Sequence, residues 1–88
     1  MLTKYIEAAM RRAEYEWLAG DQVFYGHVPE LAGVWASGKT EAECAETLRE
    51  VVEDWVMLGL RDGDEFPVIE GMELKFRDAA EFEAKADE

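Results

Sequence analysis

Residues 33–44 read GVWASGKTEAEC. The second half of this stretch predicts the start of a helix, because Thr40 is a natural N-cap and Glu43, three residues later, completes a capping box. The first half, residues 34–37, contains residues that favour a β-strand. Gly38 permits a turn between the two. We therefore predict a short strand that turns directly into the strongest helix of the chain.

The expected helix has an apolar stripe at helical spacing and charged residues outside it. Its inward-facing residues are predicted to be Cys44, Leu48, Val51, Val52, Trp55, Val56 and Leu58. The helix is expected to end near residues 60–61, because an Asp-Gly-Asp sequence follows at residues 62–64.

Before this strand-to-helix junction, apolar residues recur with a period of two, which predicts strands. Residues 14–17 alternate glutamate with an aromatic residue, residues 19–22 supply a turn, and residues 23–28 form the antiparallel partner. Pro29 ends that strand because it has no N–H for a ladder. Helical spacing over residues 3–12 predicts a short helix that must dock on the domain or on a second subunit.

Alternation over residues 72–76 predicts a fourth strand, followed by a polar, acidic tail over residues 77–88. The fold class is therefore α+β, with a mostly antiparallel sheet covered on one face by one long helix. We expect a single domain over residues 1–88, made of an N-terminal helix (1–13), a core (14–76) and the acidic tail (77–88).

The charge restricts the partners. Twenty-one acidic residues against 9 basic ones give a net charge of −12. Bare nucleic acid and anionic membranes need a basic footprint, so neither is expected as a direct partner. An acidic excess of this size suits either solubility alone or association with a basic partner protein. One cysteine, no signal peptide and no membrane-length apolar run together predict a cytoplasmic protein.

Residues 33–40 match the phosphate-binding pattern G-x-x-x-x-G-K-T in full. That loop requires a buried strand ending just before its first glycine and a helix starting at its end. Only the helix is expected here, because the residues before Gly33 form a loop. We therefore predict no nucleotide binding.

No catalytic set or metal-ligand spacing is apparent, so we expect no enzymatic activity, metal or other cofactor. Tyr25 and His27, the only histidine, share one strand face, and Ser37 is expected across the hairpin. The mixture of aromatic and polar residues at the second and third strands suits a protein interface. The predicted partner-binding residues are Tyr25, His27, Pro29, Trp35 and Ser37, with core packing the favoured role for Trp35.

Residues 28–44, VPELAGVWASGKTEAEC, resemble the HicB-like antitoxin family. Its members have a Pro-acidic-Leu-Pro-Gly stretch, a strand, and Gly-x-Thr opening a helix rich in Glu and Ala. Here Ala32 replaces the second proline, Lys39 the usual acidic or polar residue, and Cys44 an alanine. The resemblance covers about residues 14–76 and fits a short, single-domain branch, because the residues after Phe76 are too few for the family's DNA-binding module.

The resemblance implies a β-β-β-α-β fold, likened to a partial ribonuclease H fold, here with an extra N-terminal helix. It also implies a type II antitoxin that masks a small basic HicA-type toxin, an mRNA-cleaving enzyme, and that forms dimers or tetramers. A stand-alone structural oligomer or adaptor without a toxin is the alternative. A small nuclease or hydrolase would rest on fold analogy only.

Overall fold

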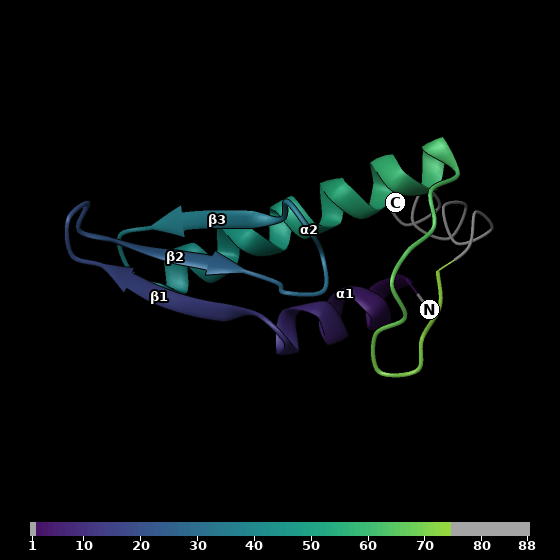
Figure 1. Ribbon diagram of the computed structural model, residues 1–88, viewed down its shortest axis with the longest axis horizontal. Coiled ribbons are helices and arrows are strands. Elements are labelled where there is room, and N and C mark those ends of the chain that lie inside the picture. Colours follow the sequence, from purple (N-terminus) through teal and green to yellow (C-terminus); the bar gives the residue numbers. More distant parts are fainter. Residues whose placement is uncertain (1, 75–88) are drawn as a thin grey trace, which may run out of the picture.

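The computed structural model describes residues 2–74, arranged as a three-stranded sheet and two helices (Figure 1). In chain order the elements are α1 (Leu2–Arg11), β1 (Glu14–Leu18), β2 (Val23–His27), β3 (Trp35–Gly38) and α2 (Glu41–Asp62). The predicted α+β fold is confirmed. The acidic tail and the last two residues of the predicted fourth strand lie outside the described residues. In the described part of the chain, no helix has both the length and the apolar character needed to cross a membrane.

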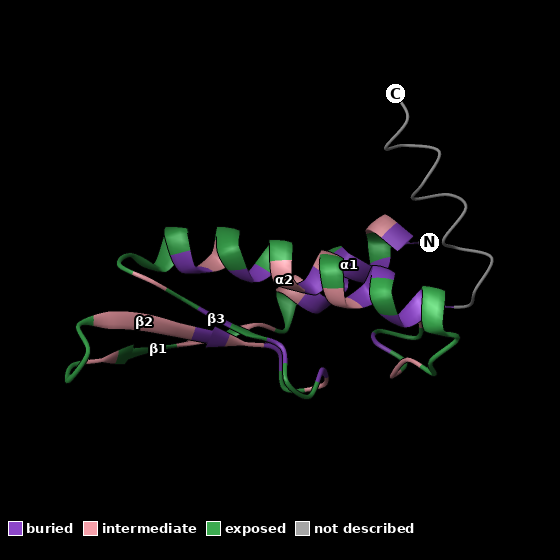
Figure 2. Ribbon diagram, turned by 90° about the horizontal axis from the view of Figure 1, so that it is seen from above, coloured by how far each residue is buried: buried purple, intermediate pink, exposed green. Residues whose placement is uncertain are grey.

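The sheet has the order β1-β2-β3, with both pairs antiparallel. Figure 2 shows α2 running along one face of the sheet, while the described residues leave the other face uncovered. The predicted layer pair, with one long helix on an antiparallel sheet, is confirmed.

Small residues on the covered face let α2 approach the sheet closely. Gly26, Ala36 and Gly38 lie on this face, and the Cys44 thiol donates a hydrogen bond to the Ala36 carbonyl oxygen at 3.6 Å. A Cβ atom placed on Gly38 would lie 2.5 Å from the backbone nitrogen of Cys44. Over β3 the helix therefore lies against strand backbone, whereas the Tyr15 ring of β1 lies over Gly26 on the same face.

The strand-to-helix junction within residues 33–44 has the conformation that its sequence predicts. Oγ1 of Thr40 accepts a hydrogen bond from the backbone N–H of Glu43 at 3.0 Å. The Glu43 carboxylate accepts from the N–H of Lys39 at 3.3 Å, one residue earlier than in a standard capping box. At the other end Gly63 adopts the left-handed conformation (φ 71°), and the N–H of Asp64 donates to the Gly59 carbonyl.

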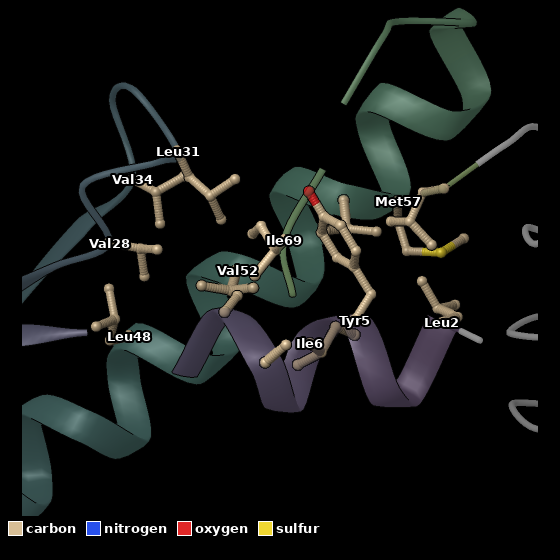
Figure 3. Packing of buried hydrophobic residues seen from close by; sticks show 14 of the residues in the cluster. Leu2, Tyr5, Ile6, Val28, Leu31, Val34, Leu48, Val52, Met57 and Ile69 are labelled. Atoms are coloured by element: carbon tan, nitrogen blue, oxygen red, sulfur yellow. The ribbon is translucent and has the colours of Figure 1, made fainter. Parts of the chain in front are cut away.

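The main apolar core lies beyond the sheet, where α1 packs against the second half of α2 (Figures 1 and 3). Leu2, Tyr5 and Ile6 of α1 meet Val52 and Met57 of α2 in this core (Figure 3). Residues from the loop before β3 and from the segment after α2 close its sides, namely Val28, Leu31, Val34, Ile69 and Leu74. The sequence leaves open whether the N-terminal helix docks on its own domain or on a second subunit. In the described structure it packs on its own domain.

The predicted inward orientation of one residue of the helical stripe is wrong. Leu58 is 59% exposed, whereas Met57 and Leu60 are buried. Val52, Val56 and Leu60 form an i, i+4 row, and Leu58 is rotated about 200° around the helix axis from Val56. The side of α2 that faces α1 therefore includes Met57 and Leu60 instead.

The fourth strand predicted over residues 72–76 is not observed in its described part. Met72 forms only an isolated antiparallel bridge with Ile69. Glu70 and Gly71 between them both have positive φ (50° and 76°), as in a type I′ turn. Arg11 holds this turn through an ion pair with Glu70 at 2.6 Å. Met72, the first residue of the predicted strand, therefore closes a tight turn, and the two described residues after it form no strand.

Tyr5 gives the fold a dependence on alkaline pH. Its buried hydroxyl donates a hydrogen bond to the Pro67 carbonyl oxygen at 2.6 Å, and burial, followed by the nearby Glu30 charge, raises the pKa of Tyr5 to about 12. Since the unfolded value is about 10, this contribution to stability is constant below pH 10 and is lost as the pH rises from 10 to 12. We expect the free energy of unfolding, measured in urea by circular dichroism, to fall across that interval.

Tyr5→Phe is the control for this effect. The variant should lose about 1 kcal/mol at pH 8, from the missing hydrogen bond, but its stability should fall less steeply above pH 10. Burial also raises the pKa of Tyr15 and of Cys44, so a residual slope is expected. Equal slopes for the native chain and the variant would contradict the assignment to Tyr5.

Candidate functional site

The uncovered face of the sheet brings together four of the five residues predicted to bind a partner. Tyr25 pairs with Ser37 and His27 pairs with Trp35 across β2 and β3. These four alternate with Gly26 and Ala36, which face α2, so they lie on the opposite side of the sheet (Figure 2). We call this surface the open face. Pro29 lies outside it, at an exposed position of the turn that follows β2.

Three aromatic rings form a row on the open face. The Tyr25 and His27 rings are stacked, with centroids 5.4 Å apart and an interplanar angle of 25°. The Trp35 ring lies 6.0 Å from that of Tyr25, at 31°. The His27 and Trp35 rings thus each lie within 31° of the plane of the Tyr25 ring.

The role in core packing favoured for Trp35 is wrong. Its side chain is 56% exposed, because α2 covers the other face of β3 and contacts Ala36. Trp17, on the covered face of β1, is 49% exposed and packs edge-to-face on Phe24 with centroids 5.0 Å apart. Trp17 is the last but one residue of β1, close to the β1–β2 turn, and Figure 2 shows that this end of the hairpin extends past the start of α2. Only Trp55 packs against the core, as a half-buried residue.

Two residues of the open face were missed by the sequence prediction. Glu14 pairs with His27 and Glu16 pairs with Tyr25, so both carboxylates stand beside the aromatic row. Both are exposed. The signal was available in the sequence, because antiparallel pairing of residues 14–17 with residues 23–28 puts alternate residues of both strands on the same face. The open face is therefore acidic as well as aromatic.

His27 has an incomplete set of hydrogen bonds. Its Nδ1 atom is buried and has no hydrogen-bond partner among the described residues. Buried polar atoms are almost always paired in native proteins, and an unpaired one calls for an explanation. His27 is the last residue of β2, and its register partners are Glu14 of β1 on one side and Trp35 of β3 on the other.

The phosphate-binding pattern has the wrong conformation for that role. Residues 35–38 are extended and pair with β2, and residues 29–33 before them form turns rather than a strand. A phosphate loop instead wraps its backbone N–H groups around the ligand. The structure therefore agrees with the prediction that this match lacks the context of a nucleotide site.

A separate concave region lies at the C-terminal end of α2. Its apolar floor is formed by Trp55, Gly59 and Phe66, and its rim includes Asp62, Asp64 and Glu65. Across residues 2–74, no three His, Cys, Asp or Glu side chains gather in a way that could hold a metal ion. The aromatic and acidic open face is the surface with the more distinctive chemistry.

Comparison with known proteins gives a family and a similar solved structure. The UPF0150-like family model matches residues 4–67. The crystal structure of TTHA0281 from Thermus thermophilus is similar over 84% of this chain and 91% of that chain, with 40% sequence identity and a TM-score of 0.79. No curated protein matches the chain. The family match spans most of the chain, including the whole sheet and nearly all of both helices, and the chain therefore belongs to the UPF0150-like family.

Proposed function

We propose that this chain is an antitoxin-type protein-binding domain that neutralises a small basic, mRNA-cleaving toxin of the HicA type. The observation that supports this most is the open face, where three ordered aromatic rings and two carboxylates lie on the uncovered side of the sheet. Exposed aromatic residues in an ordered cluster are typical of protein interfaces. Membership of the UPF0150-like family is compatible with the HicB-like resemblance of residues 28–44.

Charge supplies the proposed mechanism of neutralisation. A toxin that cleaves RNA must present a basic surface to the phosphate backbone. The net charge of −12 on this chain attracts such a surface and speeds the encounter. The open face would then occupy the surface that RNA needs, so that inhibition results from competition and requires no chemistry by the antitoxin.

Co-expression tests the proposal. The chain would be produced together with any small basic protein encoded by a neighbouring gene, and the mixture assayed for co-purification and for cleavage of an RNA substrate. We expect a stable complex that lacks RNA cleavage, and cleavage should return when the toxin is released by denaturation and refolded alone. Failure of the basic protein to co-purify, or RNA cleavage unaffected by this chain, would refute the antitoxin role.

Two tryptophan variants locate the interface. Trp35→Ala should weaken the complex at least about tenfold, since exposed tryptophans are frequent hot spots. Trp17→Ala removes a similarly exposed ring from the opposite face and should change the affinity little. Calorimetric titration measures both, and equal losses would place the interface elsewhere.

A second candidate function, a stand-alone structural oligomer or adaptor, is favoured by the two outer strands of the sheet. Within residues 2–74, β1 and β3 each pair on one side only, and such edges can pair with another chain. Light scattering on the purified chain would reveal a dimer or tetramer. An oligomer that forms through the open face and binds no basic protein would favour this candidate over the first.

A further inference from the structure

We propose that the open face recognises its partner through arginine, and specifically through two arginines separated by one residue in an extended segment. This inference rests on the proposed function, because it specifies the chemistry by which a protein partner would be held. Each guanidinium would lie against an aromatic ring of β2 or β3 and pair with a carboxylate of β1.

The aromatic half of the site can receive cations. Trp35 is 56% exposed, so part of its ring face is open, and tryptophan is the strongest aromatic partner for a cation. Tyr25 keeps the neighbouring ring within 31° of the Trp35 plane. Because the two ring planes have a similar tilt, a planar guanidinium can stack on one ring without being blocked by the other.

The acidic half of the site has no cation of its own. Neither Glu14 nor Glu16 has an ion-pair partner among residues 2–74, where three arginines instead pair with Glu70, Glu30 and Glu53. The three strands contain no lysine or arginine. Two exposed carboxylates on one strand, both unneutralised, attract a positively charged group to the row of rings beside them.

The spacing of the face indicates how the cations are arranged. The face is built from two cross-strand rows, Glu14–His27–Trp35 and Glu16–Tyr25–Ser37. Successive rows on one side of a sheet are separated by two residues, or about 6.7 Å. Alternate side chains of an extended peptide have the same spacing. A partner segment that runs along the strands would therefore place the two arginines of an Arg-x-Arg sequence over the two rows.

Arginine fits this arrangement better than lysine. The guanidinium is planar, stacks on aromatic rings, is weakly hydrated and donates two parallel hydrogen bonds to one carboxylate. A lysine ammonium offers a point charge and keeps its water more strongly. Glu14 is the cross-strand neighbour of the His27 ring and Glu16 that of the Tyr25 ring, with Cβ atoms about 5 Å apart, whereas Trp35 lies one strand further on. One guanidinium can therefore contact a carboxylate and the ring next to it.

Short peptides test the inference without the toxin. The probe is an acetylated and amidated peptide, Gly-Arg-Thr-Arg-Gly, and the comparison peptide has lysine at both arginine positions. Binding to the full chain is followed by two-dimensional ¹⁵N–¹H NMR at low salt. We expect shifts concentrated in β1, β2 and β3, and binding of the lysine peptide about tenfold weaker, which corresponds to the difference between stacked bidentate and point-charge contacts.

A pair of double variants separates the site from the overall charge. Glu14→Gln with Glu16→Gln removes the carboxylates of the open face, and Glu46→Gln with Glu50→Gln removes two exposed charges from α2. The first pair should weaken peptide binding at least tenfold, and the second should change it less than twofold. Equal weakening by both pairs, or equal affinity for the two peptides, would overturn the inference.

The two proposals can fail separately. If the toxin is neutralised but the arginine peptide does not bind the open face, the antitoxin role stands and arginine recognition falls. If the peptide binds as expected but no basic protein is neutralised, the recognition chemistry stands and the antitoxin role falls.

Discussion

Replacing Gly38 by alanine is expected to destabilise the protein by about 3 kcal/mol, at the upper end of what overpacking a core costs. The added Cβ would lie 2.5 Å from the backbone nitrogen of Cys44, 2.9 Å from its Cα and 3.0 Å from the carbonyl carbon of Glu43. All three are backbone atoms of the first turn of α2, so no side-chain rotation can relieve the clash. The helix would have to move away from β3 as a unit.

Gly20→Ala is the matched control. Gly20 lies in the turn between β1 and β2, and an added Cβ there meets no atom within 4 Å. The free energy of unfolding of the Gly20→Ala variant should differ from that of the native chain by less than about 1 kcal/mol. Alanine lowers the conformational entropy of the unfolded chain, so any such change should be stabilising. Urea denaturation followed by circular dichroism measures both variants. Gly38→Ala with native stability would mean that α2 does not lie against β3 as described.

The second large effect is expected for Leu48→Ala, at about 2–5 kcal/mol. Leu48 is fully buried at the middle of the stripe of α2 that faces the sheet and the core (Figure 3). Truncation would remove apolar contacts and leave a cavity that the surrounding backbone cannot close. For a domain whose total stability is of the order of 5–15 kcal/mol, this is a large fraction.

Leu58→Ala provides the comparison on the same helix. Leu58 is 59% exposed, and alanine favours the helix at least as much as leucine does, so we expect a change within about 0.5 kcal/mol. Thermal unfolding of the two variants under identical conditions gives the contrast. Similar losses for both would show that the orientation of α2 differs from the one described.

The sequence was most informative where the structure depends on local interactions. The cap of α2 at Thr40, its end at Gly63 and the pairing of β1 with β2 all follow from contacts between residues close in the chain. These are properties of short segments, and a periodic pattern with clear breakers reports them directly.

The errors arose where distant parts of the chain decide the outcome. Core packing is the role that the sequence favours for Trp35, but the residues of β3 that face α2 are Ala36 and Gly38. Leu58 lies on the outer side of α2, because the side facing α1 lies elsewhere. Alternation at residues 72–76 indicated a strand, although Met72 instead bridges Ile69 next to the core. Each case depends on which element packs where, and a local pattern does not contain that information.

The candidate site was predicted in part for the same reason. Tyr25, His27 and Ser37 were placed together by strand alternation and hairpin pairing, which are local. Glu14 and Glu16 belong to the same face, but glutamates on a strand suggest only a solvated surface until their cross-strand neighbours are identified. An interface is a property of neighbours in space, and it appears once the register is known.

The separation of the main core from the sheet implies a gradient of local stability along the molecule. The side chains with the least exposure gather where α1, α2 and the segment near Ile69 meet, whereas the tip of the β1–β2 hairpin extends past the start of α2 (Figures 1 and 2). Regions with few buried apolar contacts open at lower free energy than the core does. Backbone amides near the hairpin tip should therefore exchange with deuterated solvent well before those around Val52 and Val56. The two rows of the open face lie between the hairpin tip and the core, so a bound partner would slow amide exchange in the strands more than in the core.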